Sequence, residues 1–146
     1  MAIKWDVRPA VVGDAEAICE ICSSDLGYPC NPGLVRKKME GLSPVREAVF
    51  VALVDGKCIG YIHVERYDTL YFESMANILG IAVRKEFQAG GVGSALLAAA
   101  ESWAKENGIR LMRVISGANR TGAHAFYEAK GYVFGKMQKN FSKTLV

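Results

Sequence analysis

The pattern of apolar and polar positions predicts the strands of this chain. Residues 3–7 (IKWDV) alternate between apolar and polar. Residues 48–54 (AVFVALV) and 57–67 (KCIGYIHVERY) are two further predicted strands. Asp55-Gly56 separates the last two stretches and is typical of a hairpin turn. Residues 77–83 (NILGIAV) are nearly all apolar, as in a strand in the middle of a sheet. Further strands are predicted over residues 109–115, 132–137 and 140–146.

Apolar residues spaced three and four apart predict four helices. The first covers about Ala15–Ser24 with Asp14 as its N-cap, and the second begins at Asn31-Pro32. The third helix has a buried face made of Val92, Leu96, Ala99, Ala100 and Trp103. The fourth lies within residues 118–130. Strands and helices in this order predict one α/β domain, residues 1–146, with a mixed sheet.

Composition and charge narrow the class of protein. The chain has 146 residues, of which 51% are hydrophobic and 23% charged, so a single folded core is expected. No apolar run reaches the roughly 20 residues of a membrane span, and the first ten residues lack a signal peptide's apolar region. We therefore expect a cytoplasmic protein. The net charge of +3 is spread along the chain without a basic stripe, which argues against nucleic-acid binding.

Four cysteines raise the question of a metal or redox site. Cys19 and Cys22 form a C-x-x-C pair, but a second close pair is missing and neither histidine lies at ligand spacing. Ala15, Ile18, Cys19 and Cys22 recur at helical spacing. We interpret the pair as part of a helix's core face, in a reducing compartment and without a metal.

The stretch FQAGGVGSALL, residues 87–97, has three glycines between a strand and a helix. Such a turn presents free N–H groups and the positive end of the helix dipole, which bind phosphate. A P-loop requires a Lys that is missing here, and the dinucleotide fingerprint requires a glycine where Leu96 stands. A glycine-rich turn without a ligand is the remaining alternative.

Two motifs in the chain resemble those of a known family. Residues 88–93 (QAGGVG) resemble the Q/R-x-x-G-x-G/A pyrophosphate loop of the GNAT superfamily of acyl-CoA N-acyltransferases. Residues 117–132 (GANRTGAHAFYEAKGY) resemble its second motif, an Asn followed eight residues later by a Tyr. The order of elements is similar from about residue 3 to 145. The resemblance implies an acyl-CoA N-acyltransferase fold, with a mostly antiparallel central sheet, about four helices, and acetyl-CoA as co-substrate.

The resemblance also implies a site. Residues 79–83 should splay from residues 111–115, and the pantetheine arm should lie in the gap, with the Val83 N–H polarising the acyl carbonyl. Tyr127 would be the general acid, and Asn119 would bind the pantetheine or the loop. The full set implied to bind the co-substrate is Ile81, Ala82, Val83, Gln88, Ala89, Gly90, Gly91, Val92, Gly93, Ser94, Asn119, Ala123 and Phe126.

The residue at the family's general-base position departs from the family pattern. Asn77 stands where many relatives have a Glu, and an amide does not accept the proton. We expect a water held by Asn77 and activated by Glu73, with His63 and Glu65 as rival bases. The loop also lacks the basic residue that relatives often place between Gln88 and Gly91. The phosphate charge would then be met by the helix dipole and by neighbours: Arg84, Lys85 or Arg120.

The resemblance therefore predicts an N-acetyltransferase that acts on a primary amine of a small molecule or a peptide. A protein acetyltransferase acting on N-termini or lysines is an alternative, as are transfer of a longer acyl chain and a non-catalytic module that binds or senses acyl-CoA. The acceptor is expected between the first two helices with residues 27–33 and, opposite them, residues 68–74. Homodimerisation is a further expectation from the family.

Overall fold

The computed structural model describes residues 4–146, which form two compact units. One unit ends at Val114 and the other is Ile115–Val146. Neither unit, as far as it is described, contains a helix long and apolar enough to span a membrane.

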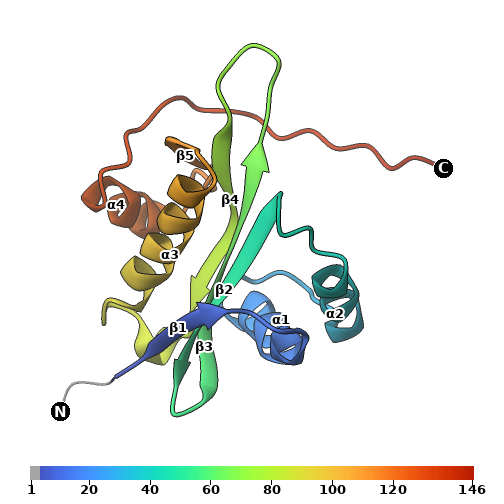
Figure 1. The fold of residues 1–146 in the computed structure, drawn as a ribbon, viewed down its shortest axis with the longest axis vertical. Helices are drawn as coiled ribbons and strands as arrows, with labels where there is room; N and C mark the ends of the chain where they lie inside the picture. Colours follow the sequence, from blue (N-terminus) through green and yellow to red (C-terminus); the bar gives the residue numbers. More distant parts are fainter. Residues whose placement is uncertain (1–3) are drawn as a thin grey trace. The chain divides into compact units, whose positions relative to one another are not determined.

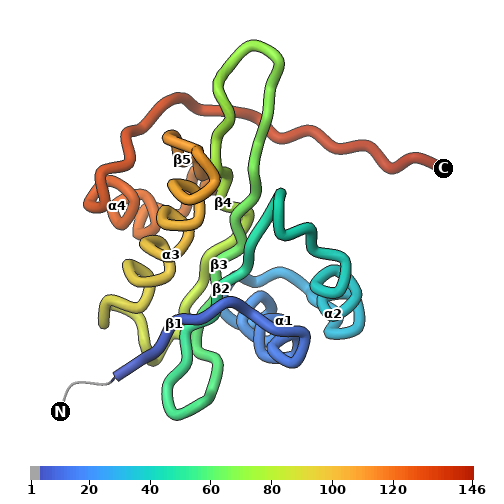
Figure 2. The backbone as a smooth tube through the Cα atoms, in the orientation of Figure 1, coloured from blue at the N-terminus to red at the C-terminus, as the bar shows by residue number. Residues whose placement is uncertain are grey.

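The first unit is built on a five-stranded sheet (Figures 1 and 2). Its strands are β1 (Asp6–Pro9), β2 (Glu47–Val54), β3 (Lys57–Tyr67), β4 (Met75–Val83) and β5 (Leu111–Val114), side by side in that order. Neighbours from β1 to β4 pair antiparallel, while β4 and β5 pair parallel. The prediction of a mixed, mostly antiparallel sheet is confirmed.

Three helices cover the sheet: α1 (Ala15–Ser24), α2 (Pro32–Glu40) and α3 (Val92–Glu106). Figure 1 shows α1 and α2 on one side of the strands and α3 on the other. Ile18 and Ile21 of α1 pack with Val51, Tyr61 and Ala82 in one apolar cluster. The predicted face of α3 is buried at Val92, Leu96, Ala100 and Trp103, with Ala99 partly buried. Burial of these apolar faces supplies the main driving force for this arrangement.

Helix starts follow the sequence in one case and depart from it in another. Asn31 caps α2 as predicted, because its Oδ1 accepts from the Gly33 and Leu34 N–H groups at 2.8 and 3.2 Å. Asp14 precedes α1 but its side chain makes no bond to that helix.

The Asp14 carboxylate instead bonds to residues that precede it in the chain. It accepts from the Val11 N–H at 2.8 Å and forms a two-bond pair with the Arg8 guanidinium at 2.8 and 3.0 Å. Burial alone would raise the pKa of Asp14, but these bonds outweigh it and hold that pKa below its ordinary value. Asp14 therefore occupies the predicted N-cap position of α1, but the predicted capping bond from its side chain is not formed.

The first predicted strand is shifted along the chain. Residues 3–7 were expected, whereas β1 pairs Asp6 with Leu53 and Pro9 with Phe50, and residue 3 lies outside the described part. The strand over 109–115 is likewise shorter, at Leu111–Val114. In both cases the partner strand, rather than the local pattern, decides where pairing begins and ends.

The second unit contains α4 (Thr121–Ala129), which confirms the fourth predicted helix. The two strands predicted over residues 132–137 and 140–146 are not formed, and these residues have no regular secondary structure. Their apolar side chains are exposed, among them Val133, Phe134, Met137, Phe141 and Leu145. A strand requires a neighbour for its N–H and C=O groups, and none pairs with these residues in the described structure.

Candidate functional site

A bulge in β4 interrupts the sheet. His63 pairs with Gly80 and Val64 pairs with Ile78, so Leu79 has no partner in β3. Pairing of β4 with β5 ends at the same place, at Ile78 and Val114. A bulge bends and twists its strand and changes the direction of the residues after it. Beyond the bulge, β4 therefore has a free edge in the described structure, and this edge contains Ile81, Ala82 and Val83.

The edge offers main-chain groups to a ligand. Successive residues of a strand present their N–H and C=O groups in turn, so an extended polar chain can pair with them like an added strand. At its end, the Gln88 side chain donates to the Val83 carbonyl at 2.9 Å, which ties the following loop to β4. Pairing of β4 with β5 thus ends at the place where the resemblance implies that the two strands splay.

Gly80 lets the bulge lie against a buried hydroxyl. A Cβ at residue 80 would be 2.6 Å from Tyr61 Oη, too close for any real contact. Tyr61 is 7% exposed and its Oη accepts from Cys22 Sγ at 3.3 Å. Burial, with Cys22 beside it, raises the pKa of this phenol, which stays neutral in the physiological range.

We expect Gly80→Ala to lower the free energy of unfolding by about 1–3 kcal/mol, because the new methyl group displaces the Tyr61 ring or the bulge. Removing the hydroxyl in Tyr61→Phe leaves the ring carbon Cζ, at 3.3 Å, as the nearest atom. The double variant should therefore lose less stability than the two single variants added together. Urea unfolding of all four proteins measures this, and strict additivity would refute the close contact.

The glycine loop joins β4 to α3 through a short 3₁₀ turn, η2 (Lys85–Phe87). Ala89 and Gly91 have positive φ values of 65° and 93°, and Gly91 is the N-cap of α3. No side chain caps the first turn of α3, and that turn carries no acidic residue. Its N–H groups are therefore available to an anion, which the helix dipole also favours. Val92, Gly93 and Ser94 form this first turn.

Gly91 and Gly90 differ in how strictly their positions require a glycine. The Gly91 conformation favours glycine, and a Cβ there would also lie 3.3 Å from the Trp5 ring. Gly90 has no such constraint, because the nearest atom to its Cβ position is the Phe87 carbonyl oxygen at 3.6 Å. Sequence reasoning missed the contact with Trp5, since residues so far apart give no local signal.

Arg84, one of the cations expected to meet phosphate charge, is engaged elsewhere. Its Nε donates to the Cys58 carbonyl at 3.3 Å and its Nη2 to Glu20 Oε2 at 3.0 Å. The guanidinium therefore ties the end of β4 to α1.

In the second unit, α4 presents Ala123, Phe126 and Tyr127 on a partly buried face. The Tyr127 ring contacts Phe126 edge-on, with centroids 5.5 Å apart, and Tyr132 at 5.9 Å. Burial raises the pKa of the Tyr127 hydroxyl, and Arg120 opposes this only in part. The hydroxyl therefore keeps its proton above the ordinary pH range for tyrosine.

Asn119 lies just before α4. Its side chain folds over Gly117, with Oδ1 3.1 Å from where a Cβ would be. Arg120 occupies the N-cap position, and no side chain caps the helix. Capping is therefore not what the Asn119 amide does in this structure.

Four polar side chains form a row across β2, β3, β4 and β5, which we term the polar row: Glu47, Glu65, Asn77 and Arg113. Each is the cross-strand partner of the next. Asn77 Nδ2 donates to Glu65 Oε2 at 3.2 Å, and the Arg113 guanidinium lies over the Tyr67 ring at 4.5 Å.

The structure therefore brings Asn77 together with Glu65. His63 Nε2 lies 2.8 Å from Glu47 Oε1. Glu73, the carboxylate expected beside Asn77, is largely exposed and pairs with Arg110 at 3.1 Å. Strand alternation showed that His63 and Glu65 share a face, but the register that sets Glu65 opposite Asn77 follows from the bulge.

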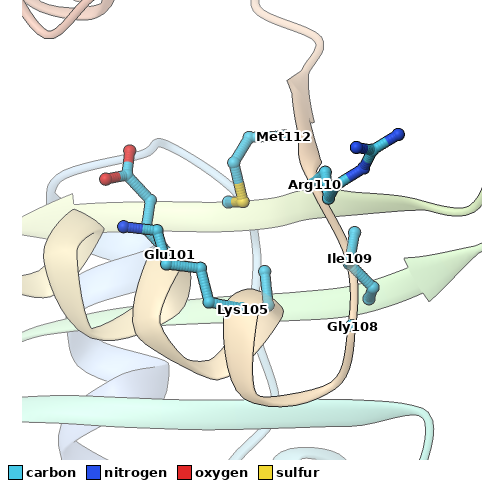
Figure 3. Close-up of a pocket in the computed structure, with 7 residues that line it drawn as sticks. Glu101, Lys105, Gly108, Ile109, Arg110 and Met112 are labelled. Atoms are coloured by element: carbon cyan, nitrogen blue, oxygen red, sulfur yellow. The ribbon is translucent and has the colours of Figure 1, made fainter.

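A pocket lies at the other end of α3 from the glycine loop (Figure 3). Glu101 and Lys105 of α3 line it, together with Gly108, Ile109, Arg110 and Met112. It contains none of the residues singled out for chemistry.

The cysteine, histidine and acidic side chains were expected to form no metal or redox site. Within residues 4–146, no three His, Cys, Asp or Glu side chains gather as metal ligands. All four cysteines are free thiols, and burial raises the pKa of Cys30 to about 11, with Cys19 and Cys22 beside it adding to the effect.

Comparisons with known proteins relate the chain to acetyltransferases. The chain is 30% identical over 132 residues to an aminoglycoside N(6')-acetyltransferase type 1 of Stenotrophomonas maltophilia, covering 86% of this chain and 84% of that protein.

Two solved structures share its fold. The aminoglycoside N-acetyltransferase AAC(6')-Iy in complex with CoA has a TM-score of 0.86 at 21% identity, covering 99% of this chain and 98% of the other. AAC(6')-Ih of Acinetobacter baumannii has a TM-score of 0.83 at 18% identity, covering 98% and 100%.

The family match covers most of the chain. Residues 15–132 match the acetyltransferase (GNAT) family, a range that includes β4, the glycine loop, the polar row and α4. The chain therefore belongs to the acetyltransferase (GNAT) family.

Proposed function

We propose that the protein transfers the acetyl group of acetyl-CoA to a primary amine of a small molecule, as a single N-acetyltransferase domain. The observation that carries this is the free edge of β4, which begins at the bulge and leads directly into the uncapped start of α3. An edge for an extended amide chain followed by a site for phosphate matches the pantetheine and pyrophosphate of coenzyme A in their covalent order.

The residue roles that we propose are those that the family resemblance implies. Main-chain groups of Ile81, Ala82 and Val83 pair with the pantetheine, and the Val83 N–H polarises the acyl carbonyl. Asn119, Ala123 and Phe126 of the second unit contribute further contacts to the co-substrate. Tyr127 gives a proton to the sulfur as the thiolate leaves.

The acetyl group passes directly from sulfur to nitrogen. With its pKa at about 11, the Cys30 thiol is almost wholly protonated at neutral pH, and a protonated thiol is a poor nucleophile. Cys19 and Cys58 are buried. These thiols therefore offer no good site for an acyl-enzyme, which supports attack by the amine itself. Free thiols also fit the cytoplasm that we propose as its compartment.

The acceptor that we propose is a small cationic amine of the aminoglycoside class. The relative from Stenotrophomonas maltophilia is an aminoglycoside N(6')-acetyltransferase, and the polar row here places two carboxylates, Glu47 and Glu65, on neighbouring strands. Like charges directly opposite each other destabilise a sheet, and a cationic ligand, together with His63 beside Glu47, would offset this repulsion.

A panel of amines tests the proposed function. Free-thiol release from acetyl-CoA is measured with the aminoglycoside sisomicin, a linear diamine and a lysine-containing peptide. We expect turnover with the small amines and little with the peptide. Turnover with the peptide alone would favour the protein acetyltransferase. Binding of acetyl-CoA without turnover of any amine would favour the sensing module.

A homodimer remains part of the proposal. The exposed apolar side chains in residues 133–146 support it, because segments of this kind seldom remain exposed in a soluble monomer.

A further inference from the structure

A carboxylate stands beside the position at which the resemblance places a catalytic glutamate. Asn77 occupies that position in β4, and an amide does not take up the proton of an amine. Its partner across the β3–β4 ladder is Glu65, which accepts from Asn77 Nδ2 at 3.2 Å. The carboxylate thus lies in β3, one strand away from the family position in β4. The Asn77 amide, which occupies that position, donates a hydrogen bond to it.

The Asn77 amide turns its Nδ2 toward Glu65, and its carbonyl Oδ1 is left unsatisfied among the described residues. Asn77 Oδ1 is buried and has no hydrogen-bond partner within residues 4–146. A buried polar atom without a hydrogen bond lowers the free energy of unfolding by about 1–3 kcal/mol. The opposite orientation would set two acceptor oxygens against each other, so the bond to Glu65 decides how the amide lies. A donor on a bound amine or water would remove the remaining cost.

Glu65 is also close to the free edge of β4 along the ladder. The Glu65–Asn77 pair is followed by Val64–Ile78, then by the bulged Leu79, and then by His63–Gly80. The edge that we propose for the thioester therefore begins two residues after Asn77. A carboxylate at this distance along the strand suits an amine that approaches the acyl carbon.

Other charged groups around Glu65 have partners of their own. Glu47 on β2 contacts His63, and Arg113 on β5 lies over Tyr67. Glu65 itself is bonded to the uncharged Asn77. Of the two carboxylates in the polar row, Glu65 is therefore the one without a basic or aromatic partner among residues 4–146.

We propose that Glu65 receives the proton of the acceptor ammonium, directly or through one water, and that Asn77 is the positioning residue that aims it. The inference rests on the proposed acetyltransferase function. An ammonium nitrogen must lose two protons to become an amide nitrogen. The first passes to Glu65 and on to solvent, which frees the lone pair to form the C–N bond. The C–S bond then breaks with its electron pair on sulfur. The second proton leaves the nitrogen and balances the one that Tyr127 gives to sulfur.

Glu65→Gln tests the assignment, since it keeps the shape of the side chain and removes the proton acceptor. We expect kcat to fall about 30-fold, below the usual range for a general base because water can take part of the role. The kcat/KM of the variant should depend on the fraction of acceptor that is already neutral in solution, so its decrease should begin at a higher pH than in the wild type, while acetyl-CoA affinity by calorimetry stays unchanged. The matched control is Glu106→Gln, an exposed carboxylate at the end of α3, which should keep kcat within about threefold.

An exchange of the two side chains gives the decisive comparison. Glu65→Gln combined with Asn77→Glu returns a carboxylate to the pair from the other strand, and we expect it to regain at least about tenfold of the lost kcat. Undiminished kcat and an unchanged pH profile in Glu65→Gln would overturn the inference. So would the same loss appearing in Glu73→Gln or His63→Gln instead. A wild-type protein that acetylates no amine would overturn the proposed function, and this inference with it.

Discussion

Tyr127→Phe is expected to lower kcat about 100- to 1,000-fold while leaving the affinity for acetyl-CoA within a few-fold. The substitution keeps the ring and its contacts with Phe126 and Tyr132, so the helix should fold as before. What is lost is the proton for the departing thiolate. A positioned general acid contributes about 10²–10⁴-fold, and a thiolate is a good enough leaving group for the lower half of that range.

The pH dependence of kcat tests whether Tyr127 acts as the general acid. Because burial raises the pKa of Tyr127, the acid form persists above the ordinary tyrosine range and is lost only as pH rises through that higher value. The wild-type kcat should therefore fall at high pH, and the variant should lack this limb. Tyr132→Phe is the matched control, because it removes a hydroxyl from the neighbouring ring and should keep kcat within about threefold. Equal rates for Tyr127→Phe and wild type would exclude the acid role and strengthen the sensing alternative.

Local patterns predicted most elements of the fold correctly. The Asp55-Gly56 turn predicted the β2–β3 hairpin, and Asn31 predicted the start of α2, because both signals act within a few residues. Asp14 shows the limit of such reasoning. Its residue type suits an N-cap, but a cation six residues earlier, Arg8, competes for the carboxylate and prevails.

Strand ends were harder to predict because they depend on partners. The pattern in residues 132–146 is that of two strands, yet a strand forms only where another lies beside it. The same reason explains why β5 is four residues long although its apolar pattern is longer.

The site was predictable where it depends on motif and unpredictable where it depends on register. The glycine loop and α4 follow from residue types at fixed spacing. The Glu65–Asn77 pair does not, because one extra residue in β4, Leu79, changes which side chains meet across the ladder. Glu73 is close to Asn77 in sequence, whereas Glu65 is its neighbour in space. A loop residue has no fixed face, and a strand residue does.

The glycine loop gives the last prediction, which concerns charge rather than shape. We expect Gly90→Glu to weaken acetyl-CoA binding about 100-fold. Residue 90 is exposed, its φ is not positive, and a Cβ there meets nothing closer than 3.6 Å, so a side chain is tolerated. The new carboxylate would lie next to a doubly charged pyrophosphate. Two unit charges a few ångströms apart near a protein surface repel by up to about 4 kcal/mol. Partial screening to about 3 kcal/mol gives the stated 100-fold.

Gly90→Gln is the matched control, since glutamine has the shape of glutamate without its charge, and we expect its affinity to stay within about threefold of wild type. Isothermal calorimetry at two salt concentrations separates the effect of the side chain's charge on acetyl-CoA affinity from the effect of its shape. The gap between the Glu and Gln variants should shrink as salt rises from about 0.05 to 0.5 M, because screening shortens the reach of the carboxylate. Thermal unfolding should show both variants folded. If the two variants bind acetyl-CoA equally well, the pyrophosphate does not lie at this loop, and the free N–H groups at the start of α3 must serve another purpose.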